Sequence, residues 1–169
     1  AETQGSETNG NPTFMFHAIR DPTGANPIRN QIIKGGLDKK GKPHEKVSDV
    51  AWSVGRKPDS NGVLPLVVNT VDIPAANWTN TIGASELGTV WTDPDFDPSQ
   101  HVVYYVRVLE IPTPRWSTYD AKALGITPLA VVPATIQERA WASPIWYTPD
   151  PSLVKKAVSY PGLRDYLPE

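Results

Sequence analysis

Three aspartates, Asp93, Asp95 and Asp97, occupy alternating positions and could together bind a cation. Calcium prefers carboxylate oxygens, but its common loop also needs a glycine at the sharp turn and a distal glutamate that binds through both oxygens. Here Pro98 follows the last aspartate, and no glutamate stands at the required distance. The sequence therefore favours a solvated acidic turn, in which aspartate side chains bond to their own backbone.

The three histidines, His17, His44 and His101, are far apart in the sequence, and the chain has no cysteine. A catalytic metal centre needs about three converging protein ligands, so we expect no metal site and no cofactor within this chain. The sequence holds no Gly-x-Ser-x-Gly motif and no glycine-rich phosphate loop. The pair Gly35-Gly36 is expected only to kink the end of a strand. We therefore predict no catalytic residue.

Two glutamates lie close in sequence to arginines: Glu110 near Arg107 and Arg115, and Glu138 beside Arg139. Paired carboxylates could act as a general acid and a general base. Arginine–glutamate pairs across neighbouring strands are the commoner arrangement, and we favour that interpretation here.

Residues 101–110 show the longest alternation in the chain, which predicts a central strand. One face of this strand is uniformly apolar and belongs in a core: Val102, Tyr104, Val106 and Val108. The other face meets solvent or another polypeptide: His101, Val103, Tyr105, Arg107 and Leu109. Pro112 and Pro114 then end the strand, because proline fixes φ and restricts the residue before it.

Arg115 and Trp116 follow this proline corner, and arginine and tryptophan commonly anchor interfaces. We predict that substrate binding or an interface involves His101, Arg107, Glu110, Arg115 and Trp116. Arg115 could hold a small anionic substrate through two parallel hydrogen bonds. The alternative is a local ion pair of Arg115 with Glu110 or Asp120.

Six tryptophans is a high number for 169 residues. Five of them lie in or beside predicted strands: Trp52, Trp91, Trp116, Trp141 and Trp146. Such residues can form a platform on which carbohydrates stack, but more often they fill a core or an interface, which is the role we favour.

Short apolar segments between turn-forming residues predict a mainly β protein, an antiparallel β-sandwich with one or two short helices. The predicted strands are 13–19, 28–37, 45–52, 63–68, 101–110 and 135–147, the last broken at Pro144. Strand 63–68 contains Pro65 and should lie at a sheet edge. The predicted helices are 118–124, capped by Thr118 and ended by Gly125, and 152–160. Residues 71–73 and 78–82 look extended, and 85–87 begin a strand or a helical turn.

These elements form a polar N-terminal arm (1–12), a β-sandwich domain (13–149) and a C-terminal helical tail (150–169). A length of 169 residues suits one domain. The net charge of −2, without a basic cluster, argues against a nucleic-acid partner. No run of 18 apolar residues is present, so we expect no membrane span.

Several strings of residues, spread over 11–149, together form a distinctive pattern: QIIKG (31–35), HEKV (44–47), DVAW (49–52), VWTDPDFDP (90–98), YYVRVLEIPTPRW (104–116), ERAW (138–141) and SPIWY (143–147). In these strings the chain resembles the C-terminal part of the bacterial domain-of-unknown-function family 3604. The resemblance implies exported proteins several times longer than this chain, with an upstream region similar to metal-dependent hydrolases of the polymerase-and-histidinol-phosphatase type. It thus implies a periplasmic or extracellular location, an upstream hydrolase-like partner polypeptide or subunit, and a divalent metal held in that partner region.

Three functions remain open from the sequence. We favour the C-terminal β-sandwich portion or subunit of a larger metal-dependent hydrolase, which packs on and helps to complete a catalytic region carried by another polypeptide. The alternative is a stand-alone binding or adhesion module that uses surface tryptophans. An independent enzyme is least favoured, because no catalytic set is present. Exposure of Val103, Tyr105 and Leu109 would indicate a permanent partner, since large apolar patches rarely face water.

Overall fold

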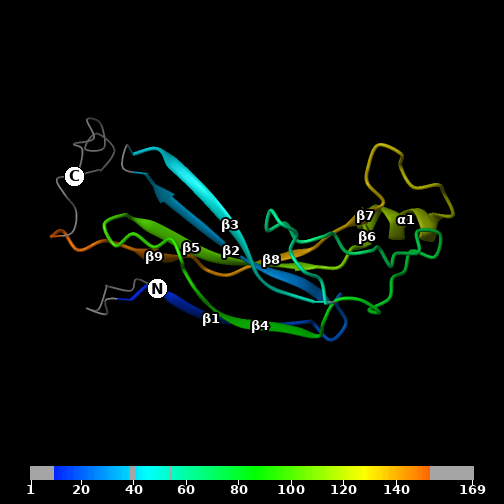
Figure 1. Ribbon diagram of the computed structural model, residues 1–169. Coiled ribbons are helices and arrows are strands. Elements are labelled where there is room, and N and C mark those ends of the chain that lie inside the picture. The colour runs from blue at the N-terminus through cyan, green and yellow to red at the C-terminus, as the bar shows by residue number, and fades with distance from the viewer. Residues whose placement is uncertain (1–9, 39–40, 54, 153–169) are drawn as a thin grey trace, which may run out of the picture.

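The computed structural model describes residues 10–38, 41–53 and 55–152 as a mainly β protein (Figure 1). Its elements are β1 (Thr13–Ile19), β2 (Pro27–Leu37), β3 (Pro43–Trp52), β4 (Glu86–Thr92), β5 (Val102–Glu110), β6 (Thr113–Pro114), α1 (Trp116–Leu124), β7 (Thr135–Ile136), β8 (Arg139–Trp141) and β9 (Ile145–Tyr147). All strand pairs are antiparallel. The predicted fold class, an antiparallel β-sandwich with a short helix, is confirmed.

The main sheet has the order β3-β2-β5-β8, and β9 pairs with β5 beside β8. Strand β5 therefore has neighbours along both of its edges, and the predicted central strand is confirmed, although it begins at Val102 rather than His101. The hairpin of β2 and β3 also forms as predicted, with a register shift between Asn30 and Gln31.

A smaller sheet of β1 and β4 packs on one face of the main sheet (Figure 1). Its inward side chains, Phe14, Phe16 and Trp91, meet a buried cluster of Ile32, Val102 and Tyr104. The alternation in β1 places Phe14 and Phe16 inside and leaves Met15 and His17 exposed. The predicted apolar face of β5 thus lies in the core between the two sheets. We call the opposite face of the main sheet the outer face.

A second core cluster lies where β5 ends, and it consists of Ala25, Ile28, Leu109 and Ile111. Leu109 was expected on the open face of its strand, but it is only 4% exposed. The long segment before β4 covers it, because Val67, Trp78 and Ile82 pack against this cluster.

The segment between β3 and β4 contains none of the strands expected there. Leu64 is buried, but Leu66 and Val68 are exposed, so the predicted edge strand 63–68 is wrong. Residues 71–77 form a turn closed by an isolated bridge between Asp72 and Asn77, and 78–82 are irregular, so neither segment is a strand. Of residues 85–87, the last two begin β4. Side chains fix this segment: the guanidinium of Arg56 donates to the carbonyls of Ser53, Pro65 and Ile28.

Residues 113–136 form the corner that follows β5. Strand β6 pairs with β7, and α1 begins at Trp116 with Arg115 as its N-cap residue. The predicted Thr118 cap is wrong, because Thr118 is buried and its hydroxyl donates to the Ala134 carbonyl at 2.6 Å. The predicted end is confirmed, since Gly125 adopts a left-handed conformation with φ of 65°.

The predicted strand 135–147 is three separate strands rather than one. Strand β7 belongs to the corner, and β8 and β9 pair with different parts of β5. The break at Pro144 is confirmed, and a second break falls between Ile136 and Arg139. The predicted helix 152–160 and most of the N-terminal arm fall outside the described residues. Among the residues that are described, no helix has the length and apolar character needed to cross a membrane.

Candidate functional site

The five predicted site residues do not form one site. His101 stands directly before β5 and Glu110 ends it. Nine residue-to-residue steps of extended chain separate them by about 30 Å, at a rise of about 3.3 Å per residue. Arg115 and Trp116 lie in the corner, close to the Glu110 end of β5. The His101 end and the corner are therefore two separate candidate regions.

Arg107 has its guanidinium engaged within the sheet. Its Nε and Nη2 both donate to the Gln31 side-chain oxygen, at 2.9 and 2.7 Å. The Gln31 amide donates in turn to Asp49, which also pairs with Arg29 at 3.3 Å. This network joins β5, β2 and β3 on the outer face, so Arg107 is a structural residue here.

Glu110 forms no ion pair within the part of the chain that the structure describes, and the expected arginine–glutamate pairing is wrong. Burial raises the pKa of Glu110, and the carboxylates of Glu138 and Asp21 raise it further. The raised pKa therefore reflects a partly buried carboxyl group among like charges.

The corner carries a set of exposed apolar side chains, which we call the corner surface. Its members are each at least 57% exposed: Trp116, Leu124, Ile126, Leu129 and Val131. Figure 1 shows α1 and the loop after it at the end of the molecule where β5 finishes. Beside this surface, Nε of Arg115 is buried and has no hydrogen-bond partner among the described residues. The expected ion pair of Arg115 with Glu110 or Asp120 is also absent from the described part of the chain.

Asp93 is buried and ion-paired, which corrects the prediction of a solvated acidic turn. It is 1% exposed, and its Oδ2 lies 2.5 Å from Nζ of Lys34 and accepts the Tyr104 hydroxyl at 2.7 Å. Its Oδ1 accepts the backbone N–H of Asp95, as expected for an aspartate turn. Lys34 also donates to the Asp95 carbonyl, while the exposed Asp95 carboxylate pairs with Lys46.

The environment keeps Asp93 charged and Tyr104 neutral. Burial by itself raises the pKa of Asp93, but hydrogen bonds from Lys34, Tyr104 and the Asp95 backbone outweigh it, and the pKa lies below its usual value. Burial, and then the Asp93 carboxylate, raise the pKa of Tyr104. The trio therefore joins the loop after β4 to strands β2 and β5, and its location in the core gives it a structural role.

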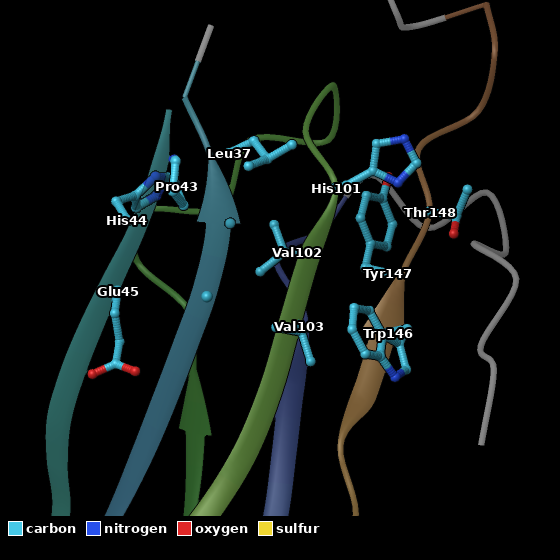
Figure 2. Close-up of a pocket in the computed structure, with 12 residues that line it drawn as sticks. Leu37, Pro43, His44, Glu45, His101, Val102, Val103, Trp146, Tyr147 and Thr148 are labelled. Carbon is cyan, nitrogen blue, oxygen red and sulfur yellow. The ribbon is translucent and has the colours of Figure 1, made fainter. Parts of the chain in front are cut away.

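A groove of about 560 Å³ lies at the other end of the main sheet, where β2, β3, β5 and β9 meet (Figure 2). Its lining includes Gly35, Gly36, His44, Glu45, His101, Val103, Trp146 and Thr148. The two glycines are not a kink at a strand end. They lie within β2 and pair with β3 on one side and β5 on the other.

Four of these residues form a single row across the sheet: Glu45, Gly35, Val103 and Trp146. Directly paired residues on neighbouring strands share a face, and Val103 alternates with the core residues Val102 and Tyr104. The row therefore lies on the outer face. Figure 2 shows Glu45 on β3 and Trp146 on β9 at opposite sides of the groove, with β2 and β5 between them.

The tryptophans divide between the core and the surface. Trp91 packs in the core and Trp78 covers the second cluster, but three others are more than half exposed: Trp116, Trp141 and Trp146. For these three a role in the core is wrong. Two glycines inside a strand, together with a tryptophan two strands away, would have been the sequence signal for the groove, but the pairing of β5 with β9 was needed to recognise it.

The described residues contain no group of three or more histidine, aspartate or glutamate side chains that could hold a metal ion. His17 instead pairs with Glu86 at 3.1 Å on the surface of the smaller sheet, and His101 lines the groove.

We predict that the purified 169-residue chain binds no divalent metal stoichiometrically and hydrolyses no phosphoester, because a catalytic metal site needs about three converging ligands. Metal analysis after dialysis against zinc or manganese, with a p-nitrophenyl phosphate assay, measures both. Tight binding that disappears in His17→Ala or His101→Ala would contradict this prediction.

A protein-family model described as "Protein of unknown function (DUF3604)" matches residues 2–149. No curated protein and no solved structure matches the chain. The matched range includes the groove, the buried Lys34–Asp93–Tyr104 trio and the corner surface.

Proposed function

Because the chain belongs to the DUF3604 family of proteins of unknown function, we propose that it is the C-terminal β-sandwich portion or subunit of a larger, metal-dependent hydrolase. In this proposal it packs on a catalytic region carried by an upstream polypeptide, which holds the divalent metal, in the periplasm or outside the cell. The observation that carries the proposal is the corner surface, with five apolar side chains each at least 57% exposed. Contiguous exposed apolar surface is typical of interaction sites.

The helix of this corner supports the proposal. Isolated helices shorter than about 12–15 residues are marginal in water, and packing supplies most of their stability in proteins. Helix α1 has 9 residues, of which only Thr118 and Ala121 are buried. Its first and last residues, Trp116 and Leu124, face away from the chain's own core. A partner polypeptide on this side would bury them and would stabilise the helix.

Arg115 adds a polar group to the same region. A buried donor that lacks an acceptor costs about 1–3 kcal/mol, more when the group is charged. Nε of Arg115 is such a donor. A carboxylate or carbonyl of the partner, or a small anionic substrate at the interface, would satisfy it. We therefore keep Arg115 and Trp116 in the proposed contact, and we leave out Arg107, whose guanidinium is already bonded to Gln31.

The test uses the chain and its upstream polypeptide, produced separately and titrated by calorimetry. Trp116→Ala should weaken their association by about tenfold or more, as expected when a tryptophan anchor is removed from an interface. Trp141→Ala is the matched control, because Trp141 is similarly exposed, at 59%, but lies on β8 outside the corner. Its affinity should stay within about twofold of the unmodified chain.

Hydrogen exchange provides a second measurement. When the chain is joined to the upstream polypeptide, the amides of 116–131 should exchange more slowly than in the chain alone, and those of the turn 59–62 should not change. No association in the titration, together with equal exchange of 116–131 in both proteins, would contradict the proposal.

A further inference from the structure

The groove at the His101 end of β5 has features of a small-ligand site that the proposed function does not use. Its volume of about 560 Å³ lies within the range of about 300–1,000 Å³ that is common for such sites. Its lining includes the outer-face row of Glu45, Gly35, Val103 and Trp146, at the opposite end of β5 from the corner surface. The inference below does not depend on the proposed function.

Two adjacent glycines in β2 leave part of the groove without side chains. A Cβ on Gly35 would lie 3.0 Å from Cγ1 of Val103, and one on Gly36 would lie 3.3 Å from the His101 carbonyl. Glycine within a strand weakens it, and it often marks a place where a ligand approaches the backbone. Here Gly35 leaves its place in the row without a side chain, next to Glu45, and Gly36 belongs to the neighbouring row. Val103 stands between Gly35 and Trp146, and the strands of Glu45 and Trp146 are three steps, or about 14 Å, apart.

The indole of Trp146 stands at the β9 end of this row, next to Val103. Trp146 is 57% exposed, although its β9 neighbours Ile145 and Tyr147 are partly buried. An exposed tryptophan offers a flat apolar surface with one N–H donor. The C–H face of a sugar ring fits such a surface, and its hydroxyls need polar partners at the sides.

The described lining of the groove supplies those partners. Its lining contains a carboxylate (Glu45), two imidazoles (His44 and His101) and a hydroxyl (Thr148), but no described lysine or arginine. Among the described lining residues, a phosphate, sulfate or uronate would meet the Glu45 carboxylate, which repels anions. An uncharged polyhydroxylated ligand meets both acceptors and donors.

We propose that this groove binds an uncharged oligosaccharide, with one sugar ring stacked on Trp146 and hydroxyl groups hydrogen-bonded by Glu45, His101 and Thr148. The predicted substrate-binding role of His101 then belongs to this groove and not to a site shared with Arg107 or Arg115. The ring on Trp146 lies beside Val103 of β5, and the rest of the oligosaccharide extends across Gly35 of β2 toward Glu45 of β3.

The experiment titrates the 169-residue chain with maltohexaose, cellohexaose, xylohexaose and chitohexaose, followed by calorimetry and tryptophan fluorescence. At least one of the four should bind. Trp146→Ala should then weaken binding by about tenfold or more, since stacking and burial of an aromatic face contribute well over 1 kcal/mol. Trp141→Ala removes an equally exposed indole from β8, outside the groove lining, and should leave the affinity within about twofold.

Glu45→Ala is the second variant, since Glu45 is exposed on β3 and its removal should not affect folding. Loss of a hydrogen bond to a charged group should weaken binding by about tenfold or more. The proposal is overturned if none of the four oligosaccharides binds, or if Trp146→Ala and Glu45→Ala both bind as tightly as the unmodified chain. It is also overturned if Trp141→Ala loses as much affinity as Trp146→Ala, or if oligogalacturonate binds more tightly than every neutral oligosaccharide.

Discussion

Replacing Asp93 with alanine should lower the free energy of unfolding by about 3–5 kcal/mol, the usual cost of removing one partner of a buried ion pair. The variant leaves the Lys34 ammonium, which is 9% exposed, without its counter-charge. It also removes the acceptor of the Tyr104 hydroxyl. Urea unfolding followed by circular dichroism measures the difference.

The chain offers a matched control two residues away. The Asp95 carboxylate forms an ion pair with Lys46, but both side chains are more than half exposed. Asp95→Ala should therefore cost less than about 1 kcal/mol, as is typical of surface pairs. Equal effects of the two substitutions would contradict the buried pairing of Asp93.

The same substitution should change the dependence of stability on pH. The pKa of Asp93 lies below its usual value in the folded chain, so the stability it contributes is fully present above the usual aspartate pKa of about 3.9. That contribution is lost as the pH falls through the lower folded pKa. The difference between the unmodified chain and Asp93→Ala should thus be constant from about pH 5 to 8 and should shrink below about pH 4.

Replacing Tyr104 with alanine should lower the free energy of unfolding by about 3–5 kcal/mol, because it leaves a cavity where a buried aromatic ring was packed. Tyr104 is 3% exposed, and its ring centroid lies 4.8 Å from that of Phe14 on the smaller sheet. The substitution would remove packing between the two sheets as well as the hydrogen bond to Asp93. Thermal and urea unfolding should both report it.

Tyr104→Phe separates these two contributions. It keeps the ring and removes only the hydroxyl, so it should cost about 1–3 kcal/mol, the range for an unpaired buried polar partner. The pKa of Asp93 should rise toward its usual value in this variant, because one of the hydrogen bonds that lower it is gone. A melting temperature unchanged in Tyr104→Ala would contradict the packing of this ring between the sheets.

Local patterns predicted the parts of the fold that local chemistry controls. The alternation of residues 102–110 identified the central strand and its core face, and the turn after Leu37 identified the hairpin of β2 and β3. Gly125 ends α1 because glycine readily adopts the left-handed conformation, and its backbone N–H bonds to carbonyls of the same helix. Each of these features depends on residues close together in the chain.

The incorrect predictions concern features that depend on residues far apart in the chain. Asp93 forms the predicted turn with Asp95, but its burial depends on Lys34, from a strand about sixty positions earlier. Thr118 is a good cap by type, yet its hydroxyl bonds to Ala134 across the corner. The groove needed the register of four strands, which no single segment contains. His101 was therefore placed with Arg115 by sequence proximity, although the two lie at different ends of the molecule.

The division of residues 135–147 into short strands also determines what one edge of the main sheet offers to another chain. The long edges of a sheet expose unpaired backbone groups, and another chain can extend the sheet there. On one side of the main sheet, β8 and β9 have only 3 residues each, with Pro144 between them. On the other side, β3 begins with Pro43 and carries exposed charges at Glu45 and Lys46. Both edges of the main sheet thus disfavour pairing with a strand of another chain. Replacement of Pro144 would allow a longer edge strand there, on which other chains could pair and aggregate.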